Sequence, residues 1–452
     1  MPIAVHPLRI LAFTCALLTA APAGAADPAL PRHAERDAPR AAKRLILQHD
    51  GHPFAPFAPF ADALRLVAEG RRTFRFDTFG DEAFWGGALR LHEAVAQLSP
   101  RDALGLGLKV DADALPHRLA AQLRAGRVDL DDPRTTVALL RLGAVVGVTG
   151  FFDEAGGLVS VGIQCALCHS TVDDSLAPGV GRRLDGWANR DLDVGRVIAA
   201  APDLSPFEQL LGVDADTVRQ VLLGWGPGKF DATLLLDGKT QGPTGSAAVL
   251  IPPAFGLAGV NLHTWTGWGS VPHWNALVAN LEMGGQGTFV DHRLDDAERF
   301  PIAAREGFSE VRRTPDRVTP KLPGLHLYQL ALEAPRPPRG SFDAQAAARG
   351  KALFEGRARC ATCHVPPLYT EPGHNLHAPA EIGIDAFQAE RSPTQGYRTA
   401  PLRGLWTHGK GGYYHDGRFA TLRDVIDHYD GFLGLGLGEG EKSDLAEFLK
   451  SL

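Results

Sequence analysis

The pentapeptides Cys-Ala-Leu-Cys-His at residues 165–169 and Cys-Ala-Thr-Cys-His at residues 360–364 decide the fold class of this chain of 452 residues. In a Cys-x-x-Cys-His motif, two thiols can add to the two vinyl groups of one haem while the adjoining histidine ligates the iron. Four of the five cysteines of the chain lie in these motifs. We therefore predict two covalently bound haems of c type. Their attachment and axial residues are Cys165, Cys168 and His169 for the first haem, and Cys360, Cys363 and His364 for the second.

A zinc site is the competing interpretation, because two Cys-x-x-Cys pairs can supply four ligands to one tetrahedral ion. It leaves the histidine that follows each pair without a role. Haem attachment gives all six residues a role, so it is the interpretation we adopt.

The start of the chain has the pattern of a cleaved secretory signal. Residues 1–25 contain Arg9, an apolar run at residues 10–20 and a small-residue ending, Ala-Gly-Ala, and they include the fifth cysteine, Cys15. Export agrees with the motifs, since c-type haem is attached outside the bacterial cytoplasm. No other segment approaches the roughly 18 to 20 apolar residues of a membrane span. We predict a soluble periplasmic protein without a membrane span.

Composition describes a globular chain and excludes little. Hydrophobic residues make up 44% of the sequence, and the formal net charge of -6 argues against a nucleic-acid partner. The counts of 51 glycines and 33 prolines fit a loop-rich protein. We expect mainly α structure with long irregular loops.

The chain divides most clearly at the proline-rich run of residues 333–340, which cannot sustain a helix or a central strand. After it, Ser341 can cap a helix over residues 344–356 that leads into the second motif. The chain ends with a helix over residues 443–452. Its apolar face consists of Leu445, Phe448, Leu449 and Leu452. Terminal helices that cross beside the haem are typical of cytochrome c.

We predict two cytochrome c-like haem domains in tandem, at residues 131–335 and 336–452. An apolar helix over residues 135–148 should precede the first motif. Residues 26–130 form an N-terminal extension with helical patches such as residues 88–98, and we expect it to pack on the first haem domain.

Two further segments carry specific strings. Residues 399–429 contain Pro-x-Leu-Arg-type, aromatic-His-Asp-Gly and Thr-Leu elements, and residues 251–285 contain Pro, aromatic, Trp-x-Gly and Glu-Met elements. The matching residues are Pro401, Leu402, Arg403, Tyr414, His415, Asp416, Gly417, Thr421 and Leu422, and then Pro253, Phe255, Trp265, Gly267, Glu282 and Met283. Over residues 160–452 the chain resembles the bacterial di-haem cytochrome c peroxidase superfamily, which includes the MauG-like enzymes. The N-terminal extension and the distance between the motifs are more similar to the rubber oxygenase branch.

The resemblance implies that peroxide or oxygen reacts at the first haem while the second relays electrons. The short peroxidases have a distal histidine in the loop before Trp-x-Gly, but residues 239–262 contain none, and His263 lies beside Trp265 instead. We expect the first haem to be open. An open site admits substrate, whereas a strong sixth ligand blocks the iron.

The sixth ligand of the second haem is expected at Tyr429 or His428. The peroxidases have a methionine there, but the two methionines of this chain are Met1 and Met283. The MauG-like enzymes resemble this chain in having tyrosine, and histidine occurs in the oxygenase branch. Either ligand lowers the potential relative to methionine. A packed core tyrosine is the alternative for Tyr429.

Glu282 is the candidate acid and base, because cleavage of an O–O bond needs a group that moves a proton from the near oxygen to the far one. The alternative is a surface helix glutamate. Trp265 is the candidate relay between the haems. Trp268 and Trp274 could serve instead, or all three could only pack.

Arg403 and His415 are expected to organise haem propionates and backbone. Calcium stays open, because the family's asparagine ligand is replaced here by an apolar run. That run is Ala248, Val249 and Leu250.

Three function classes follow. A di-haem peroxidase-type oxidoreductase, acting on hydrogen peroxide or dioxygen with a small redox protein as electron donor, fits the motifs best. An oxygenase that cleaves an apolar organic substrate is second, encouraged by the inserted loop and the N-terminal extension. A plain electron-transfer cytochrome is third, and the open first haem argues against it.

Overall fold

The computed structural model describes residues 57–241 and 246–452, and the predicted signal at residues 1–25 lies outside them. Over the described residues the chain is mainly helical, and its short strands form two-stranded sheets. The prediction of a mainly α fold is confirmed. The predicted tandem of cytochrome c-like domains stays a prediction. Below, the N-terminal part means the described residues up to 335, and the C-terminal part means residues 336–452.

The helices of the N-terminal part are α2 (Phe57–Phe76), α3 (Leu91–Gln97), α4 (Pro100–Gly105), α5 (His117–Arg124), α6 (Pro133–Arg141), α7 (Ala166–His169), α8 (Val194–Ala199), α9 (Ser205–Leu211), α10 (Ala215–Leu223), α11 (Leu234–Asp237), α12 (Val271–Leu277), α13 (Pro301–Glu306) and α14 (Leu322–Ala331). Those of the C-terminal part are α15 (Ala344–Glu355), α16 (Pro379–Ile382), α17 (Phe387–Glu390), α18 (Leu422–Leu433) and α19 (Glu439–Lys450). The paired strands are β1 (Val110–Asp111) with β5 (Val180–Gly181), β2 (Val148–Phe152) with β3 (Leu158–Ile163), β4 (Ser170–Val172) with β6 (Arg183–Asp185), β7 (Lys229–Phe230) with β8 (Val249–Leu250), and β9 (Thr288–Val290) with β10 (Glu310–Arg312).

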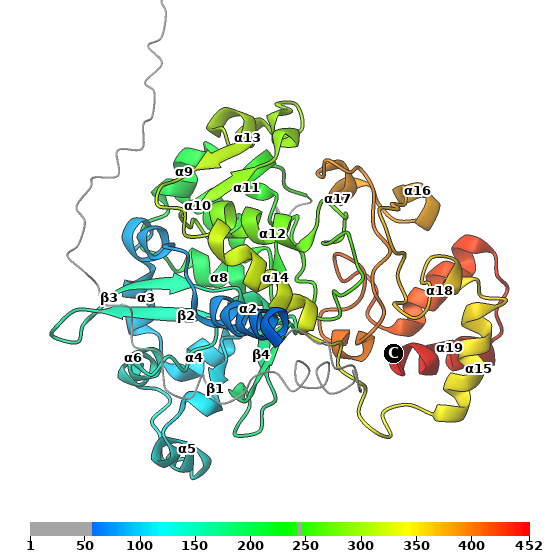
Figure 1. Ribbon diagram of the computed structural model, residues 1–452, viewed down its shortest axis with the longest axis horizontal. Coiled ribbons are helices and arrows are strands. Elements are labelled where there is room, and N and C mark those ends of the chain that lie inside the picture. The colour runs from blue at the N-terminus through cyan, green and yellow to red at the C-terminus, as the bar shows by residue number, and fades with distance from the viewer. Residues whose placement is uncertain (1–56, 242–245) are drawn as a thin grey trace, which may run out of the picture.

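The long helix α2 packs along α14 in the N-terminal part (Figure 1). The backbones approach so closely that a Cβ added at Gly70 would lie 1.9 Å from the carbonyl oxygen of Gly324. Phe74 and Tyr328 meet edge to face across this contact, with ring centroids 5.6 Å apart. The same core includes Ala166 of α7, so α2 and the first motif share one hydrophobic core.

The helix predicted over residues 135–148 is wrong beyond Arg141, where α6 ends. Two glycines then take left-handed backbone conformations, Gly143 with φ 62° and Gly147 with φ 82°. A Cβ at Gly147 would lie 2.2 Å from the Cα of Leu167, so the chain there passes directly over α7. It continues as the hairpin of β2 and β3 and enters the first motif from a strand.

Two smaller predictions also needed correction. The helical patch predicted over residues 88–98 is interrupted at Arg90, whose φ of 55° places it in the left-handed region, and α3 begins after it. The cap of α15 is Asp343 rather than Ser341, because the Asp343 side chain accepts hydrogen bonds from the backbone N–H groups of Gln345 and Ala346.

In the C-terminal part, α15 and α19 cross each other beside the second motif (Figure 1). Phe354 on α15 and Phe448 on α19 pack with ring centroids 5.1 Å apart, in a core that also includes Cys360. The crossing needs a glycine, because a Cβ at Gly350 would lie 2.0 Å from the carbonyl oxygen of Asp444.

Replacing Gly350 should therefore disrupt this crossing. We expect Gly350→Ala to lower the free energy of unfolding by roughly 3 kcal/mol, since the added methyl meets rigid backbone rather than a flexible side chain. Gly440→Ala is the matched control, because Gly440 lies on α19 with nothing within 4 Å of an added Cβ. Denaturant unfolding of the purified protein measures both. Equal stabilities for the two variants would contradict the close crossing.

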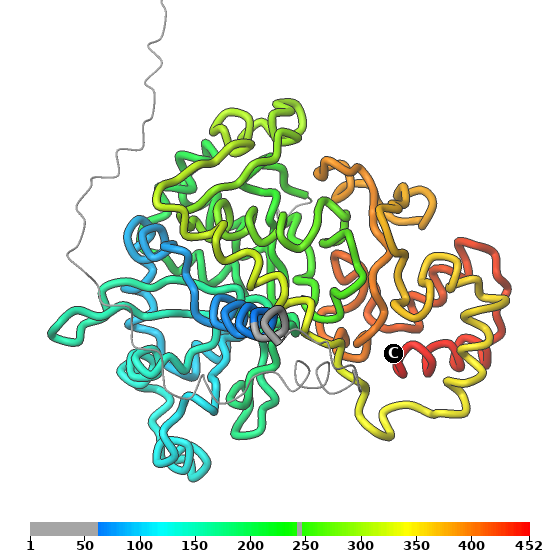
Figure 2. Tube along the Cα trace, viewed as in Figure 1, coloured from blue at the N-terminus to red at the C-terminus, as the bar shows by residue number. Residues whose placement is uncertain are grey.

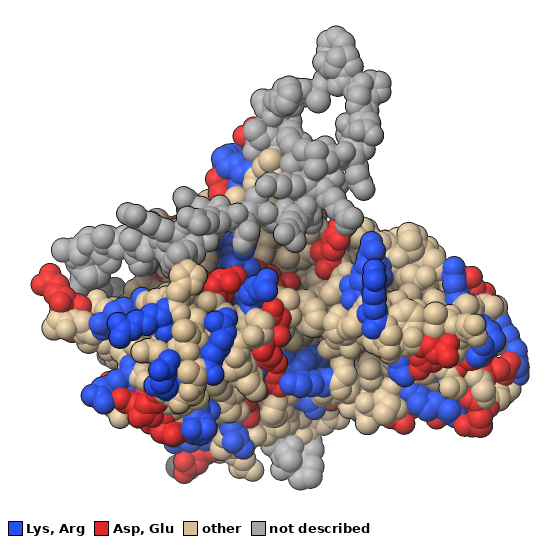
Figure 3. All heavy atoms as spheres, turned by 90° about the horizontal axis from the view of Figure 1, so that it is seen from below, with Lys and Arg blue, Asp and Glu red and all other residues tan. Residues whose placement is uncertain are grey.

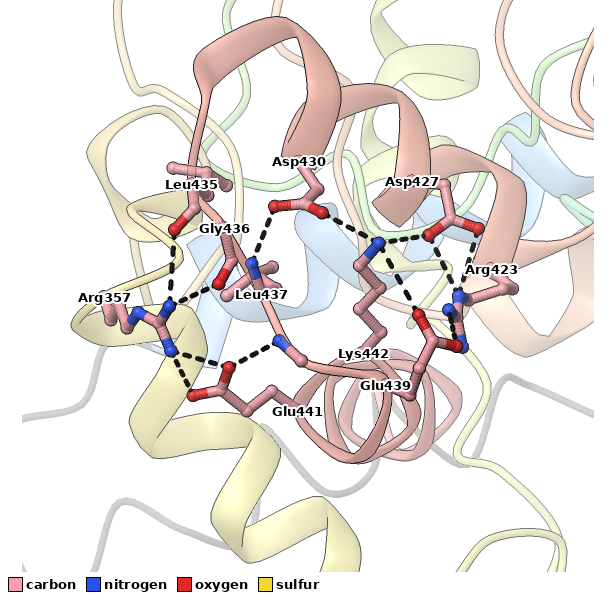
Figure 4. Close-up of polar contacts among 11 residues, drawn as sticks. Arg357, Arg423, Asp427, Asp430, Leu435, Gly436, Leu437, Glu439, Glu441 and Lys442 are labelled. Atoms are coloured by element: carbon pink, nitrogen blue, oxygen red, sulfur yellow. Dashed lines mark hydrogen bonds and ion pairs between the residues drawn. The ribbon is translucent and has the colours of Figure 1, made fainter.

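Charged side chains join the helices of the C-terminal part (Figure 4). Lys442 lies 2.8 Å from both Asp427 and Asp430, which ties α19 to α18. Arg357, just after α15, pairs with Glu441 at 2.5 Å. Each exposed pair contributes little alone, and the network holds the three helices in register.

Residues 379–400 extend from the C-terminal part back onto the N-terminal part, as the trace in Figure 2 shows. Arg391 binds the carboxylates of Asp231 and Asp237, and Thr394 donates a hydrogen bond of 2.7 Å to the carbonyl oxygen of Thr266. This segment is therefore part of the wall of the first site described below.

On the face shown in Figure 3, basic and acidic side chains are interspersed. Among the described helices, none has the length and apolar character that crossing a bilayer requires.

Candidate active site and metal centres

A cavity of about 450 Å³ lies at the first motif, and apolar side chains dominate its lining. Cys165, Cys168 and His169 line it, as do Trp265 and Glu282. The structure thus brings together the first attachment site and both predicted catalytic residues, although Trp265 follows His169 by 96 positions and Glu282 follows it by 113.

The chemistry of this donor set fits a covalent haem of c type. Cys165 and Cys168 are free thiols, and burial raises the pKa of each to about 12. Burial lowers the pKa of His169 to about 4, so its imidazole is neutral, which is the form that ligates iron. Hydrogen bonds from the N–H groups of Gly186 and Asn189 to the carbonyl oxygens of His169 and Cys168 hold the motif in place.

Glu282 stands at the end of a π-helical turn, Val278–Glu282, which directly follows α12. Such turns are rare and occur frequently at functional sites. Trp85 fixes the turn by donating a hydrogen bond of 2.8 Å to the carbonyl oxygen of Met283. The predicted alternative, a surface glutamate, does not hold, because Glu282 is 7% exposed.

The surroundings of the Glu282 carboxyl favour its protonated form. Neither of its oxygens has a hydrogen-bond partner among the described residues. Burial raises its pKa well above the ordinary value, and the charge of Asp231 raises it further. A buried carboxyl with a raised pKa can donate its proton as an acid and, once ionised, can accept one as a base.

Behind Glu282 lies a buried ion cluster that sequence reasoning missed. Arg391 is 1% exposed, and its guanidinium lies 2.7 Å from Asp237 and 3.0 Å from Asp231. Desolvation raises the pKa of Asp231, although Arg391 opposes this. The available signal was the position of both aspartates at the ends of the apolar run at residues 232–236, where carboxylates are easily buried.

Trp265 connects the first cavity to the C-terminal part. Its indole N–H donates a hydrogen bond of 2.8 Å to the carbonyl oxygen of Leu250, and the N–H of Leu250 donates one of 2.6 Å to the carbonyl oxygen of His415. Trp268 and Trp274 also line the cavity, but they pack edge to face on each other at 5.4 Å. Trp268 is further packed in an N-terminal core, and the role of Trp265 as a relay stays a prediction.

Two more side chains line this cavity. His263 is buried, and its Nε2 lies 3.2 Å from the carbonyl oxygen of Val260. Burial lowers the pKa of His263 to about 3. Arg398, which the sequence did not single out, bonds the carbonyl oxygen of Thr264 and leaves one terminal nitrogen without a partner among the described residues. Arg398 is thus a basic residue of the C-terminal part at the first site.

The second motif lies against the core between α15 and α19. The Nδ1 atom of His364 is 3.2 Å from the carbonyl oxygen of Tyr369, which fixes the ring and leaves Nε2 to ligate a metal. Burial lowers the pKa of His364, so this imidazole is also neutral. With the thiols of Cys360 and Cys363 free, the residues fit a second covalent haem.

The two candidate sixth ligands have different surroundings. Burial raises the pKa of Tyr429, with a smaller contribution from the nearby Cys363, and Tyr414 packs beside it with ring centroids 6.1 Å apart. His428 instead bonds the carbonyl oxygen of Ile382 at 3.0 Å and stacks parallel on Phe432. The geometry favours Tyr429 as the proposed ligand.

Substitution of the two residues tests this assignment. We expect Tyr429→Phe to convert the second haem from six-coordinate to high-spin, because the phenylalanine has no oxygen to ligate iron. His428→Ala should keep the wild-type ligation. Electron paramagnetic resonance of the oxidised protein measures both. Conversion by His428→Ala instead would contradict the assignment, and two low-spin haems in the wild type would contradict the predicted open first site.

The remaining predicted residues lie around these sites. Arg403 is exposed, and its role toward propionates stays a prediction. His415 is buried, stacks on Tyr397 with ring centroids 5.1 Å apart and lies 3.6 Å from Asp385. Its imidazole thus contacts side chains of the C-terminal part.

A possible ion site lies next to His415. Ligand atoms of His415, Asp385 and Asp416 lie within 4.8 Å of one another. Arg418 pairs with both carboxylates, so a cation there would compete with a guanidinium. At the position of the family's calcium ligand, the carbonyl oxygen of Leu250 is occupied by the indole of Trp265. Neither place favours calcium.

A mainly helical chain with two half-buried Cys-x-x-Cys-His sites has the features of a c-type cytochrome. No protein-family model matches it. The chain is similar to the methylamine utilization protein MauG of Methylorubrum extorquens, with 28% identity over 225 residues. The match covers 44% of this chain and 63% of the MauG chain, so the chain spans less than two thirds of that relative. The similarity supports the MauG-like superfamily for this chain.

Two solved structures are also similar to the chain. A MauG-like protein associated with microbial copper homeostasis is 21% identical, covers 47% of this chain and 76% of its own, and has a TM-score of 0.31. Hydrazine synthase of Kuenenia stuttgartiensis is 20% identical, covers 48% and 75%, and has a TM-score of 0.27. Scores this low do not establish a shared overall fold.

Proposed function

We propose that the chain is a periplasmic di-haem oxidoreductase of peroxidase type, which reduces hydrogen peroxide at the first site with electrons passed through the second. The observation that carries the proposal is the cavity that brings Cys165, Cys168 and His169 together with a buried, unpaired Glu282. The similarity to MauG supports an oxidoreductase at the coarse level.

When bound, the first haem would supply the iron at which peroxide gains two electrons. The reaction H₂O₂ + 2 H⁺ + 2 e⁻ → 2 H₂O needs protons at the oxygen that leaves. Glu282 takes the proton from the near oxygen of peroxide and returns it to the far one. The apolar lining excludes bulk water. Electrostatic interactions between Glu282 and peroxide are therefore stronger, and the proton is not lost to solvent during the transfer.

Trp265 carries charge between the two sites in this proposal. Its indole lines the first cavity, and its hydrogen bond to Leu250 leads to the backbone of the C-terminal part. A small redox protein is the proposed electron donor to the second haem. On the face shown in Figure 3, basic and acidic side chains of the described residues are mixed, so this face offers no patch of a single charge to attract the donor.

Haem content is the first test. Denatured protein should hold two covalent haems per chain that acid-acetone does not extract, because thioether bonds survive denaturation. Cys360→Ala should reduce attachment at the second site and leave the first in place. The pyridine haemochrome spectrum measures the count. Extraction of haem by acid-acetone from the wild type would contradict the proposal, as would a single haem per chain.

An oxygenase acting on an apolar substrate is the second candidate, and one observation favours it. The apolar lining of the cavity continues along α9 and α10, through Leu211, Val218 and Leu222. These helices lie within the inserted loop of residues 170–239. Mixing the reduced protein with peroxide or with dioxygen separates the candidates. Rapid oxidation by one equivalent of peroxide supports the peroxidase, and incorporation of dioxygen into an apolar product supports the oxygenase.

A further inference from the structure

A second group of buried basic side chains lies at the contact between the two parts of the chain. Residues 189–191 of the N-terminal part meet residues 408–411 of the C-terminal part. A Cβ added at Gly411 would lie 3.7 Å from a terminal nitrogen of Arg190. Lys410 reaches back across the contact to Asp191, with 2.6 Å between Nζ and the carboxylate.

The guanidinium of Arg190 is buried without a counter-charge. Arg190 is 8% exposed, and its Nε and one terminal nitrogen have no hydrogen-bond partner among the described residues. The buried Nε2 of His408 has none there either. Burial lowers the pKa of Arg190 to about 10. Buried charges in proteins are normally paired, so these donors indicate an anionic ligand.

The surrounding charges are consistent with an anion. Lys109 is buried and lies 2.7 Å from Asp191, which also pairs with Lys410. One carboxylate therefore neutralises one of the two lysines, and Arg190 adds a further positive charge. The group as a whole is positive by two charges.

The position of this group relates it to the second motif. Arg190 is absent from the described residues that line the cavity at the first motif. Leu405 and Tyr413, which flank the segment with His408, pack in the same core as Cys360. These core contacts connect His408 to the second site, while Asn189, next to Arg190, donates a hydrogen bond of 2.9 Å to the carbonyl oxygen of Cys168 in the first motif, so the donors lie between the two sites.

We propose that Arg190 and His408 form a carboxylate pocket that holds a propionate of the haem attached at Cys360 and Cys363. This inference rests on the proposed di-haem function. It replaces the exposed Arg403 as the basic residue at that propionate. It also means that the N-terminal part supplies a ligand-binding residue to the haem of the C-terminal part.

The test is spectroelectrochemical titration of the purified di-haem protein at several pH values. We expect Arg190→Gln to lower the potential of the second haem, because loss of a nearby positive charge favours the ferric form, with a change of roughly tenfold in the ferric-to-ferrous ratio at fixed potential. The unpaired propionate should also titrate, so a new pH dependence of the potential appears. Arg190→Lys should show a smaller shift. Arg182→Gln, at an exposed arginine of the same segment, is the control and should match the wild type.

Three results would overturn the inference. They are equal titrations for Arg190→Gln and Arg182→Gln, a shift confined to the first haem, and wild-type potentials that follow added phosphate at constant ionic strength, which would indicate a free anion in the pocket. If Arg190→Gln loses haem, Arg190→Lys carries the comparison. A haemochrome count below two in the wild type would instead defeat the proposed function itself.

Discussion

Glu282→Gln is expected to leave both haems attached and to slow the reaction with peroxide by roughly 10²- to 10⁴-fold, the usual range for loss of a general acid–base group. The amide has nearly the shape of the carboxyl but cannot exchange a proton. Stopped-flow absorbance in the Soret region after mixing with peroxide measures the rate. Glu298→Gln, at an exposed glutamate, is the matched control. A wild-type rate in Glu282→Gln would remove the proposed acid–base role.

The pH dependence of stability and of the peroxide reaction in the wild type should follow from the raised pKa of Glu282. Burial, and then Asp231, raise this pKa in the folded protein. Between the ordinary and the raised value, the folded state binds the proton more tightly than the unfolded state, so stability from this group falls as pH rises. If the ionised form accepts the proton from peroxide, the wild-type rate rises over the same interval. Glu282→Gln should lose both dependences.

Trp265→Phe is expected to slow electron transfer between the two haems. Peroxide should still react at the first haem, but oxidation of the second haem should slow by more than about tenfold, equivalent to ~1.4 kcal/mol in activation free energy. Phenylalanine has no indole to carry charge and loses the hydrogen bond to Leu250. Stopped-flow spectra at wavelengths specific to each haem measure the two steps.

Trp274→Phe is the comparison for this experiment, because Trp274 lines the same cavity but packs on Trp268. It should behave as the wild type. If Trp274→Phe blocks transfer while Trp265→Phe does not, the relay is assigned to the wrong tryptophan. Wild-type behaviour of Trp265→Phe and of Glu282→Gln together would favour the electron-transfer cytochrome.

The attachment motifs, the terminal helices and the mainly α class could be predicted because each depends on local spacing. Cys360 and His364 occupy fixed positions within one turn, and Leu445, Phe448 and Leu449 follow the helical period. The helix over residues 135–148 could not be placed correctly. Its apolar residues suit a helix, but the approach of Gly147 to Leu167 is a tertiary contact that local periodicity does not contain.

The contacts of the charged residues at the site could not be predicted from the local sequence either. Glu282 could be proposed from its apolar neighbours, but its burial depends on α12 and on Trp85, 197 positions away from it. Arg391 and Arg190 belong to no motif; Arg391 binds carboxylates of the other part of the chain, and Arg190 lies at the contact between the two parts. Side chains that act through contacts between remote segments leave no periodic or spacing signal, so they became visible only in three dimensions.

The crossing of residues 379–400 onto the N-terminal part has a consequence for how the protein matures. Within the described ranges, 57–241 and 246–452, the ion-pair partner of Asp231 and Asp237 is Arg391, which follows the second motif in the chain. As the chain emerges from its N-terminus, the wall behind Glu282 therefore stays incomplete until residues beyond the second motif have emerged. A fragment ending at the linker would keep two buried carboxylates without a cation, an arrangement that costs several kcal/mol. The cavity at the first motif is thus completed by residues on both sides of the proline-rich run, and the N-terminal part alone would not form it.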